Sequence, residues 1–138
     1  MTSLAHLDVC VVDPDPTLYN TLAPVFRAAR ARLRCFDRAE ALLEACPSVR
    51  CVIAMALLPG LSGMELIRRL RDAGNTAPVI LLVPPDDLAT AVSAMRSGAA
   101  DVLETPAQIS RLLHSLVASR GFAPTSRRVA APLDPNGA

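Results

Sequence analysis

The chain has 138 residues, of which 51% are hydrophobic and only 3% aromatic, so it is long enough for one domain with an aliphatic core and too short for two. Its formal net charge of +1 is too small to attract nucleic acid or anionic lipid electrostatically, so we expect neither as a partner. Because no apolar run reaches the roughly 18 residues of a membrane span and no charged leader opens the chain, we expect a cytoplasmic protein.

Five segments of strand length, two of them short, alternate with amphipathic helical segments. The clearest run, residues 52–55, lacks the apolar–polar alternation of a one-sided sheet, which favours a strand buried on both faces of a parallel sheet. The predicted strands are residues 7–12, 33–36, 52–55, 78–83 and 100–103. This order predicts an α/β fold: a doubly wound, five-stranded parallel sheet with five helices and the flavodoxin-like strand order 2-1-3-4-5.

Capping residues indicate where the predicted helices begin and end. The expected N-terminal caps are Asp15 with Pro16, Asp37 with Glu40, Ser62 with Glu65, and Thr105 with Pro106 and Gln108. Gly98 is expected to end the fourth helix, since glycine adopts the left-handed conformation there without strain. Pro24 lies inside the first predicted helix and is expected to kink or loosen it.

Residues 52–66, Val-Ile-Ala-Met-Ala-Leu-Leu-Pro-Gly-Leu-Ser-Gly-Met-Glu-Leu, resemble the centre of a bacterial two-component receiver domain of the FixJ-like group. Residues 91–106 resemble the last two elements of the same family, and the similarity extends over about residues 5–120. It implies the CheY-like form of the predicted fold. In that family the third strand ends in a phospho-accepting Asp four positions before a proline, so Pro59 places this position on Met55. A thioether cannot form an acyl phosphate.

The other phosphorylation positions that the resemblance implies are also replaced. The family binds Mg²⁺ with an acidic pair, of which only Asp13 is present, and it relies on a hydroxyl, a Lys and an aromatic residue. No Lys occurs anywhere in the chain, so no realignment restores the cation. We therefore expect a degenerate pseudo-receiver that is not an enzyme, with no catalytic residue, no metal and no cofactor. The degenerate positions are Asp13, Pro14, Met55, Val83, Val102 and Thr105.

The former phosphorylation pocket should be filled with apolar side chains. Met55 and Val83 are apolar where the family is charged or polar, so we expect them to pack on each other or on their neighbours and to exclude water. Pro84 and Pro85 fix two φ angles in the loop after the fourth strand. That loop should therefore keep one conformation.

We expect the chain to be a stand-alone receiver without an output domain, acting as a phosphorylation-independent protein–protein interaction module in two-component signalling. Receivers most often use the surface of their fourth helix, fifth strand and fifth helix. The partner expected there is a sensor histidine kinase, another response regulator or a second copy of the chain. The candidate residues are Val92, Arg96, Asp101 and Arg111, for which an ordinary solvated surface is the alternative. The domain is expected over residues 1–120, with a disordered Pro/Ala/Arg-rich tail over residues 121–138.

The main alternative function is a redox-responsive or ligand-responsive sensor that uses the degenerate pocket or the strand cysteines. Cys10, Cys35 and Cys51 are predicted to lie on three neighbouring strands, whereas Cys46 lies outside them. The four cysteines show no CxxC spacing, so we expect small buried hydrophobic residues rather than a zinc site. An enzyme of an unrecognised type is a third alternative.

Overall fold

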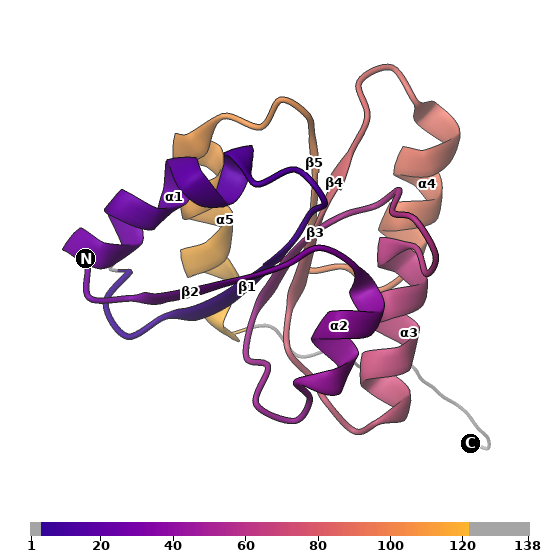
Figure 1. Ribbon diagram of the computed structural model, residues 1–138. Coiled ribbons are helices and arrows are strands. Elements are labelled where there is room, and N and C mark those ends of the chain that lie inside the picture. The colour runs from indigo at the N-terminus through magenta and orange to yellow at the C-terminus, as the bar shows by residue number, and fades with distance from the viewer. Residues whose placement is uncertain (1–3, 122–138) are drawn as a thin grey trace.

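The structure, a computed structural model that describes residues 4–121, is built on one parallel sheet with the strand order β2-β1-β3-β4-β5 (Figure 1). The strands are β1 (Asp8–Val12), β2 (Arg32–Phe36), β3 (Val52–Met55), β4 (Val79–Val83) and β5 (Asp101–Glu104). The helices are α1 (Thr17–Ala28), α2 (Ala39–Glu44), α3 (Gly63–Asp72), α4 (Leu88–Arg96) and α5 (Ile109–Ala118), followed by a 3₁₀ turn at Ser119–Gly121. The predicted fold class, strand order and five helices are confirmed.

Helices cover both faces of the sheet, with α1 and α5 on one side and α2, α3 and α4 on the other (Figure 1). The strand side chains alternate between the two cores that result. Along β4, for example, Leu81 and Val83 lie in the core beneath α2, α3 and α4, whereas Ile80 and Leu82 lie in the core beneath α1 and α5. Each fully buried Leu or Ile contributes about 1.5–3 kcal/mol relative to an exposed one. This two-sided burial explains why β3 and β4 are continuously apolar, whereas the edge strands β2 and β5 include charged residues.

Side-chain hydrogen bonds occur at two of the predicted helix starts, although α1 begins one residue later than predicted, with Pro16 and not Asp15 at its N-cap position. Ser62 Oγ accepts the backbone N–H of Glu65 at 3.1 Å, although the Glu65 carboxylate pairs with arginines of its own helix rather than completing the capping box. Asp15 Oδ1 accepts the backbone N–H of Thr17 at 2.9 Å. The first helix continues through Pro24 to Ala28, and Gly98 follows the fourth helix with a φ of 91°.

The two other predicted caps are wrong. No side chain caps α2, because the carboxylate of Glu40 accepts the backbone N–H of Leu61 in the β3–α3 loop at 3.3 Å. The fifth helix begins only at Ile109, because the hydroxyl of Thr105 donates to the carbonyl of Val83 at 3.2 Å instead of capping a helix. The Thr105–Pro106 peptide bond is cis. In both cases a hydrogen bond to a distant part of the chain replaces the local one.

The predicted domain limits stay a prediction, and the predicted location is tested only in part. Gly121 is the last residue described, so the tail predicted over residues 121–138 lies outside the described residues from Phe122 onward. Within residues 4–121, no helix is long and apolar enough to cross a membrane. The cytoplasmic location stays a prediction.

Replacing Ser62 with Ala removes the acceptor for the Glu65 N–H at the start of α3. We expect the free energy of unfolding, measured by urea denaturation, to fall by about 1 kcal/mol, as is typical when an N-cap side chain is lost. Ser93→Ala is the control, because Ser93 is an exposed residue inside α4 where alanine is the better helix former. Equal losses in the two variants would show that the cap does not stabilise α3.

Candidate functional site

The predicted phosphorylation positions lie together at the carboxyl edge of the sheet. Met55 and Val83 are the last residues of β3 and β4, while Asp13 and Thr105 directly follow β1 and β5. Parallel pairing brings these ends to one edge, with Met55 opposite Leu82 in the register. In a doubly wound sheet this edge is where ligands bind. It is therefore the first candidate for a functional site.

Asp13 is a half-buried carboxylate at this edge. Its Oδ1 accepts the backbone N–H of Asp15 at 2.9 Å, and its neighbour Pro14 is exposed. Burial raises the pKa of Asp13, the hydrogen bond from Asp15 opposes that rise, and the negative charge of Asp15 adds to it. The folded protein therefore disfavours the charged form of this side chain.

Met55 and Val83 pack on neighbouring side chains and not on each other. Val83 is 2% exposed and lies in the core beneath α2, α3 and α4. Met55 is only partly buried and packs against the core beneath α1 and α5. The expectation of an apolar pocket is therefore met for Val83, whereas the thioether of Met55 keeps some contact with solvent.

The donor set at this edge does not suit the Mg²⁺ that the receiver fold implies. Mg²⁺ requires a near-ideal octahedron of hard oxygen ligands, and a thioether such as that of Met55 is a soft ligand. One carboxylate oxygen of Asp13 is already occupied by the Asp15 N–H. Among residues 4–121, no group of three or more His, Cys, Asp or Glu side chains could hold a metal ion.

Hydrogen bonds join the β4–α4 loop to β5. The backbone N–H of Asp86 donates to the carboxylate of Glu104 at 3.2 Å. On the other side of Pro84, the carbonyl of Val83 accepts both the backbone N–H of Thr105 at 2.8 Å and its hydroxyl at 3.2 Å. With the two prolines between these contacts, the loop is held at both of its ends.

A cavity of about 480 Å³ lies beside the β5–α5 loop. Val102 and Thr105, two of the predicted degenerate positions, contribute to its wall, together with the charged side chains of Glu104 and Arg111. Its volume is within the range of small-molecule sites, roughly 300–1,000 Å³. The sequence did not indicate this cavity, because its size depends on how the loop leaves β5.

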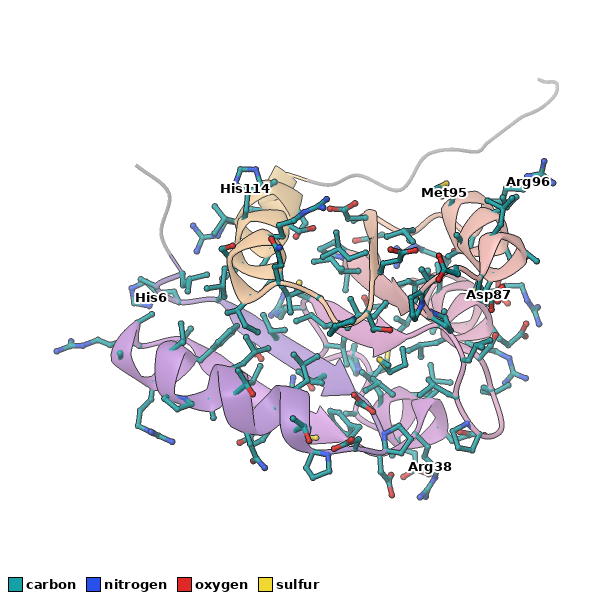
Figure 2. The ribbon with its side chains drawn as sticks, turned by 90° about the horizontal axis from the view of Figure 1, so that it is seen from above. His6, Arg38, Asp87, Met95, Arg96 and His114 are labelled. Carbon is teal, nitrogen blue, oxygen red and sulfur yellow. The ribbon has the colours of Figure 1, made fainter. Side chains whose placement is uncertain are left out.

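The outer side of α4 carries an exposed apolar stripe. Leu88, Val92 and Met95 recur at the spacing that places them on one side of a helix, and they are 77%, 37% and 67% exposed. The inward side of the same helix presents Ala94, which is fully buried, and Ala91, which is partly buried. Figure 2 shows Met95 and Arg96 on the outer side of α4. The helix therefore packs on the sheet with small residues and turns its large apolar residues to solvent.

The four residues predicted for an interaction face are all exposed. Asp101 is nevertheless engaged, since its carboxylate accepts the hydroxyl of Ser115 at 2.6 Å and so links β5 to α5. The sequence prediction included Val92 but missed Leu88 and Met95. Their spacing was the available signal, but an apolar stripe on a helix is ordinarily assigned to the core. The predicted residues at this face are Val92, Arg96, Asp101 and Arg111.

The expectation that the cysteines are buried holds for Cys10 and Cys51 but is wrong for Cys35, which is exposed, while Cys46 is partly buried. The cysteines do not form an activated thiol site. Cys10 and Cys51 are buried in different cores on opposite faces of the sheet, and all four cysteines are free. Burial raises the pKa of Cys51 to about 11 and also raises the pKa values of Cys10 and Cys35. Since the thiolate is the reactive form, these shifts make the cysteines less reactive.

Comparison with known proteins identifies a consistent set of relatives. Residues 9–117 match the family model of the response regulator receiver domain. The transcriptional regulatory protein FixJ of Bradyrhizobium diazoefficiens is 34% identical over 114 residues, which cover 81% of this chain and 55% of FixJ. The C4-dicarboxylate transport transcriptional regulatory protein DctD of Pseudomonas aeruginosa is 37% identical over 116 residues, which cover 81% of this chain and 25% of DctD.

The fold comparison agrees with the sequence comparison. The crystal structure of FixJ-N is similar with a TM-score of 0.73 and 27% identity, covering 85% of this chain and 97% of that chain. This chain spans about half the length of FixJ and about a quarter of the length of DctD. The similarity thus concerns one domain of those longer regulators.

Replacing Asp13 with Asn removes a charge that burial disfavours and leaves an amide oxygen to accept the Asp15 N–H. We expect the variant to unfold at a higher urea concentration than the wild type at neutral pH. Because the folded-state pKa of Asp13 is raised, its ionisation lowers stability above that pKa. The penalty vanishes below the unfolded-state pKa, so the difference between the two proteins should shrink as the pH falls.

Asp15→Asn is the matched control, because we expect it to change the stability to urea in the opposite direction. Hydrogen bonds from Thr17 lower the pKa of Asp15, so its charge stabilises the fold above the unfolded-state pKa, and this contribution is lost as the pH falls through the folded-state pKa. We expect Asp15→Asn to unfold at a lower urea concentration than the wild type at neutral pH. If both variants shifted stability in the same direction, the assigned environments of the two carboxylates would be wrong.

Proposed function

This chain belongs to the response regulator receiver domain family, and within it we propose that the chain acts as a pseudo-receiver. It works as a phosphorylation-independent protein–protein interaction module in two-component signalling and is not an enzyme. The partner is a sensor histidine kinase, another response regulator or a second copy of the chain. The surface of α4, β5 and α5 forms the contact.

The chemistry of the carboxyl edge supports independence from phosphorylation. Phosphoryl transfer to a side chain requires a nucleophile, a metal and fixed donors for the phosphoryl oxygens. At the positions that the family resemblance assigns to these groups, the chain has Met55, Val83 and Thr105. The raised pKa of Asp13 indicates a site that disfavours added negative charge.

The apolar stripe on α4 is the observation that carries the proposal. Leu88 and Met95 are 77% and 67% exposed, and they lie on the same side of α4 as Val92. Apolar side chains that gather on one surface mark interaction sites more often than scattered ones do. Arg96 and Arg111 supply exposed charges near the stripe, which could select the partner.

The hydrogen bonds of the β4–α4 loop support one constant form of this surface. A ligand shifts a conformational equilibrium only when two states exist and bind it differently. Asp86 and Thr105 link the loop at the start of α4 to β4 and β5. Regulation then comes from expression and from the availability of the partner.

A ligand-responsive module is the second candidate. The cavity of about 480 Å³ beside Val102 and Thr105 favours it, because the cavity adjoins the proposed contact surface through Arg111. The redox form of this alternative receives no support from the cysteines, whose raised pKa values reduce the thiolate fraction.

Incubation with acetyl phosphate and Mg²⁺ tests the chemical part of the proposal. We expect the intact mass of the wild type and of Met55→Asp to remain unchanged, while a receiver domain that has the phospho-accepting Asp, treated in parallel, gains a phosphoryl group. Met55→Asp should also lower the free energy of unfolding by about 2 kcal/mol or more, because it adds a partly buried carboxylate at the edge that holds Asp13. Phosphorylation of either protein would refute the claim.

Charged substitutions on α4 test the contact surface. Leu88→Asp and Met95→Glu change highly exposed side chains, so we expect both variants to fold normally. Self-association is measured by sedimentation, and binding to purified sensor kinases and response regulators of the same organism by calorimetry. We expect each variant to weaken the wild-type interaction at least tenfold, whereas Asn20→Asp, at an exposed position of α1, leaves it unchanged. Equal binding by all four proteins would contradict the assignment of α4.

A further inference from the structure

Charged side chains are divided unevenly between the two edges of the sheet. The loops at the carboxyl edge and the last residue of β5 carry six carboxylates and one arginine: Asp13, Asp15, Asp37, Asp86, Asp87 and Glu104, with Arg38. The amino edge carries basic side chains, among them His6, Arg50 and Arg120. In Figure 2, His6 and Asp87 lie on opposite sides of the molecule. The small net charge of the chain conceals this separation.

The acidic side chains nearest the amino edge are already engaged. Asp8 lies 3.5 Å from Arg34 and 4.0 Å from Arg32. Asp101 accepts the hydroxyl of Ser115. Asp8 also lines the larger of two cavities at this edge, where Arg32 and Arg34 offset its negative charge.

Two cavities, of about 390 and 440 Å³, open at the amino edge and share Arg50, Pro78 and Arg120 in their walls. The smaller one lies between the loop before β3 and the loop before β4, and the larger one lies between the start of β1 and the end of α5. Because both arginines line both cavities, they stand at the boundary between them. We call this pair of cavities the amino-edge cleft.

The guanidinium groups of Arg50 and Arg120 in the amino-edge cleft have N–H donors that are not used in hydrogen bonds to the described residues. Within residues 4–121, Arg50 is exposed and makes no hydrogen bond or ion pair. Arg120 uses one nitrogen to donate to the carbonyl of Ala5 at 2.8 Å. A guanidinium group has five N–H donors, and its planar fork matches the oxygens of a phosphate or carboxylate.

The wall of the smaller cavity is fixed and partly apolar. Asn75 donates to the carbonyl of Val49 at 3.1 Å and accepts the backbone N–H of Ala77 at 2.8 Å, so it ties together the two loops that form the wall. Pro47, which is exposed, and Pro78, which is partly exposed, add apolar surface on the same wall, whereas Val49 is buried behind it. Such a site suits a small molecule with one anionic group and one apolar part.

We propose that the amino-edge cleft binds a small organic phosphate, with the phosphate group between Arg50 and Arg120 and the organic part against Pro47 and Pro78. The cleft offers two exposed arginines beside two half-open cavities and not an extended basic surface, which favours a single small molecule over nucleic acid or a membrane. This site lies at the edge of the sheet opposite to the phosphorylation positions. It goes beyond the proposed function and does not rest on it.

Calorimetric titration of the full chain tests the proposal with three probes: adenosine monophosphate, inorganic phosphate and succinate. We expect saturable binding of one adenosine monophosphate per chain, with inorganic phosphate at least tenfold weaker and succinate weaker still. Arg50→Gln should lower the affinity for adenosine monophosphate at least tenfold. It should leave the free energy of unfolding unchanged, because the side chain of Arg50 makes no hydrogen bond or ion pair with the described residues. Arg120→Gln should lower it similarly.

Arg27→Gln is the matched control, because Arg27 is an exposed arginine in the last turn of α1 and does not line either cavity. We expect it to bind adenosine monophosphate like the wild type. An equal loss in Arg27→Gln would show unspecific charge attraction and overturn the proposal. Absence of saturable binding to the wild type would overturn it too, and equal binding of succinate and adenosine monophosphate would overturn the assignment of a phosphate.

Discussion

Burial of the sheet on both faces is the constraint on which the rest of this structure depends. The strands β1, β3 and β4 have neighbours on both sides, and helices cover both faces, so their side chains must be apolar and their backbone groups must pair. Polar chemistry is thereby confined to the two edges where strands begin and end. The predicted phosphorylation positions occupy one edge, and the amino-edge cleft occupies the other.

The same constraint explains the unusual surface of α4. Ala91 and Ala94 face the sheet, so the helix covers β4 and β5 with small side chains and leaves Leu88 and Met95 outside. Hydrophobicity along the sequence does not distinguish two apolar stripes on one helix. The distance between α4 and the sheet decides whether the small or the large apolar side chains of the helix are buried. That distance is set by the folded chain and not by the local sequence.

The strands were predictable because strand length and the apolar runs of β3 and β4 are local properties, and their order followed from the regular alternation of strands and helices. Local caps such as Ser62 were also predictable, whereas Glu40 and Thr105 were assigned wrongly because their partners lie far along the chain. The amino-edge cleft escaped prediction for the same reason. Arg50 and Arg120 are distant in sequence and come together only when the loops before β3 and after α5 reach one edge.

The two edges differ in what a bound ligand could do. At the carboxyl edge, the hydrogen bonds of Asp86 and Thr105 hold the β4–α4 loop, so a second conformation has little to stabilise it. An anion at Arg50 and Arg120 would touch loops before β3 and β4 and would stabilise the folded chain as a whole, by about 2.7 kcal/mol at a ligand concentration 100 times the Kd. A change of that size alters the abundance of a protein several-fold. Such a ligand would therefore control how much of the α4 surface is present without changing its shape.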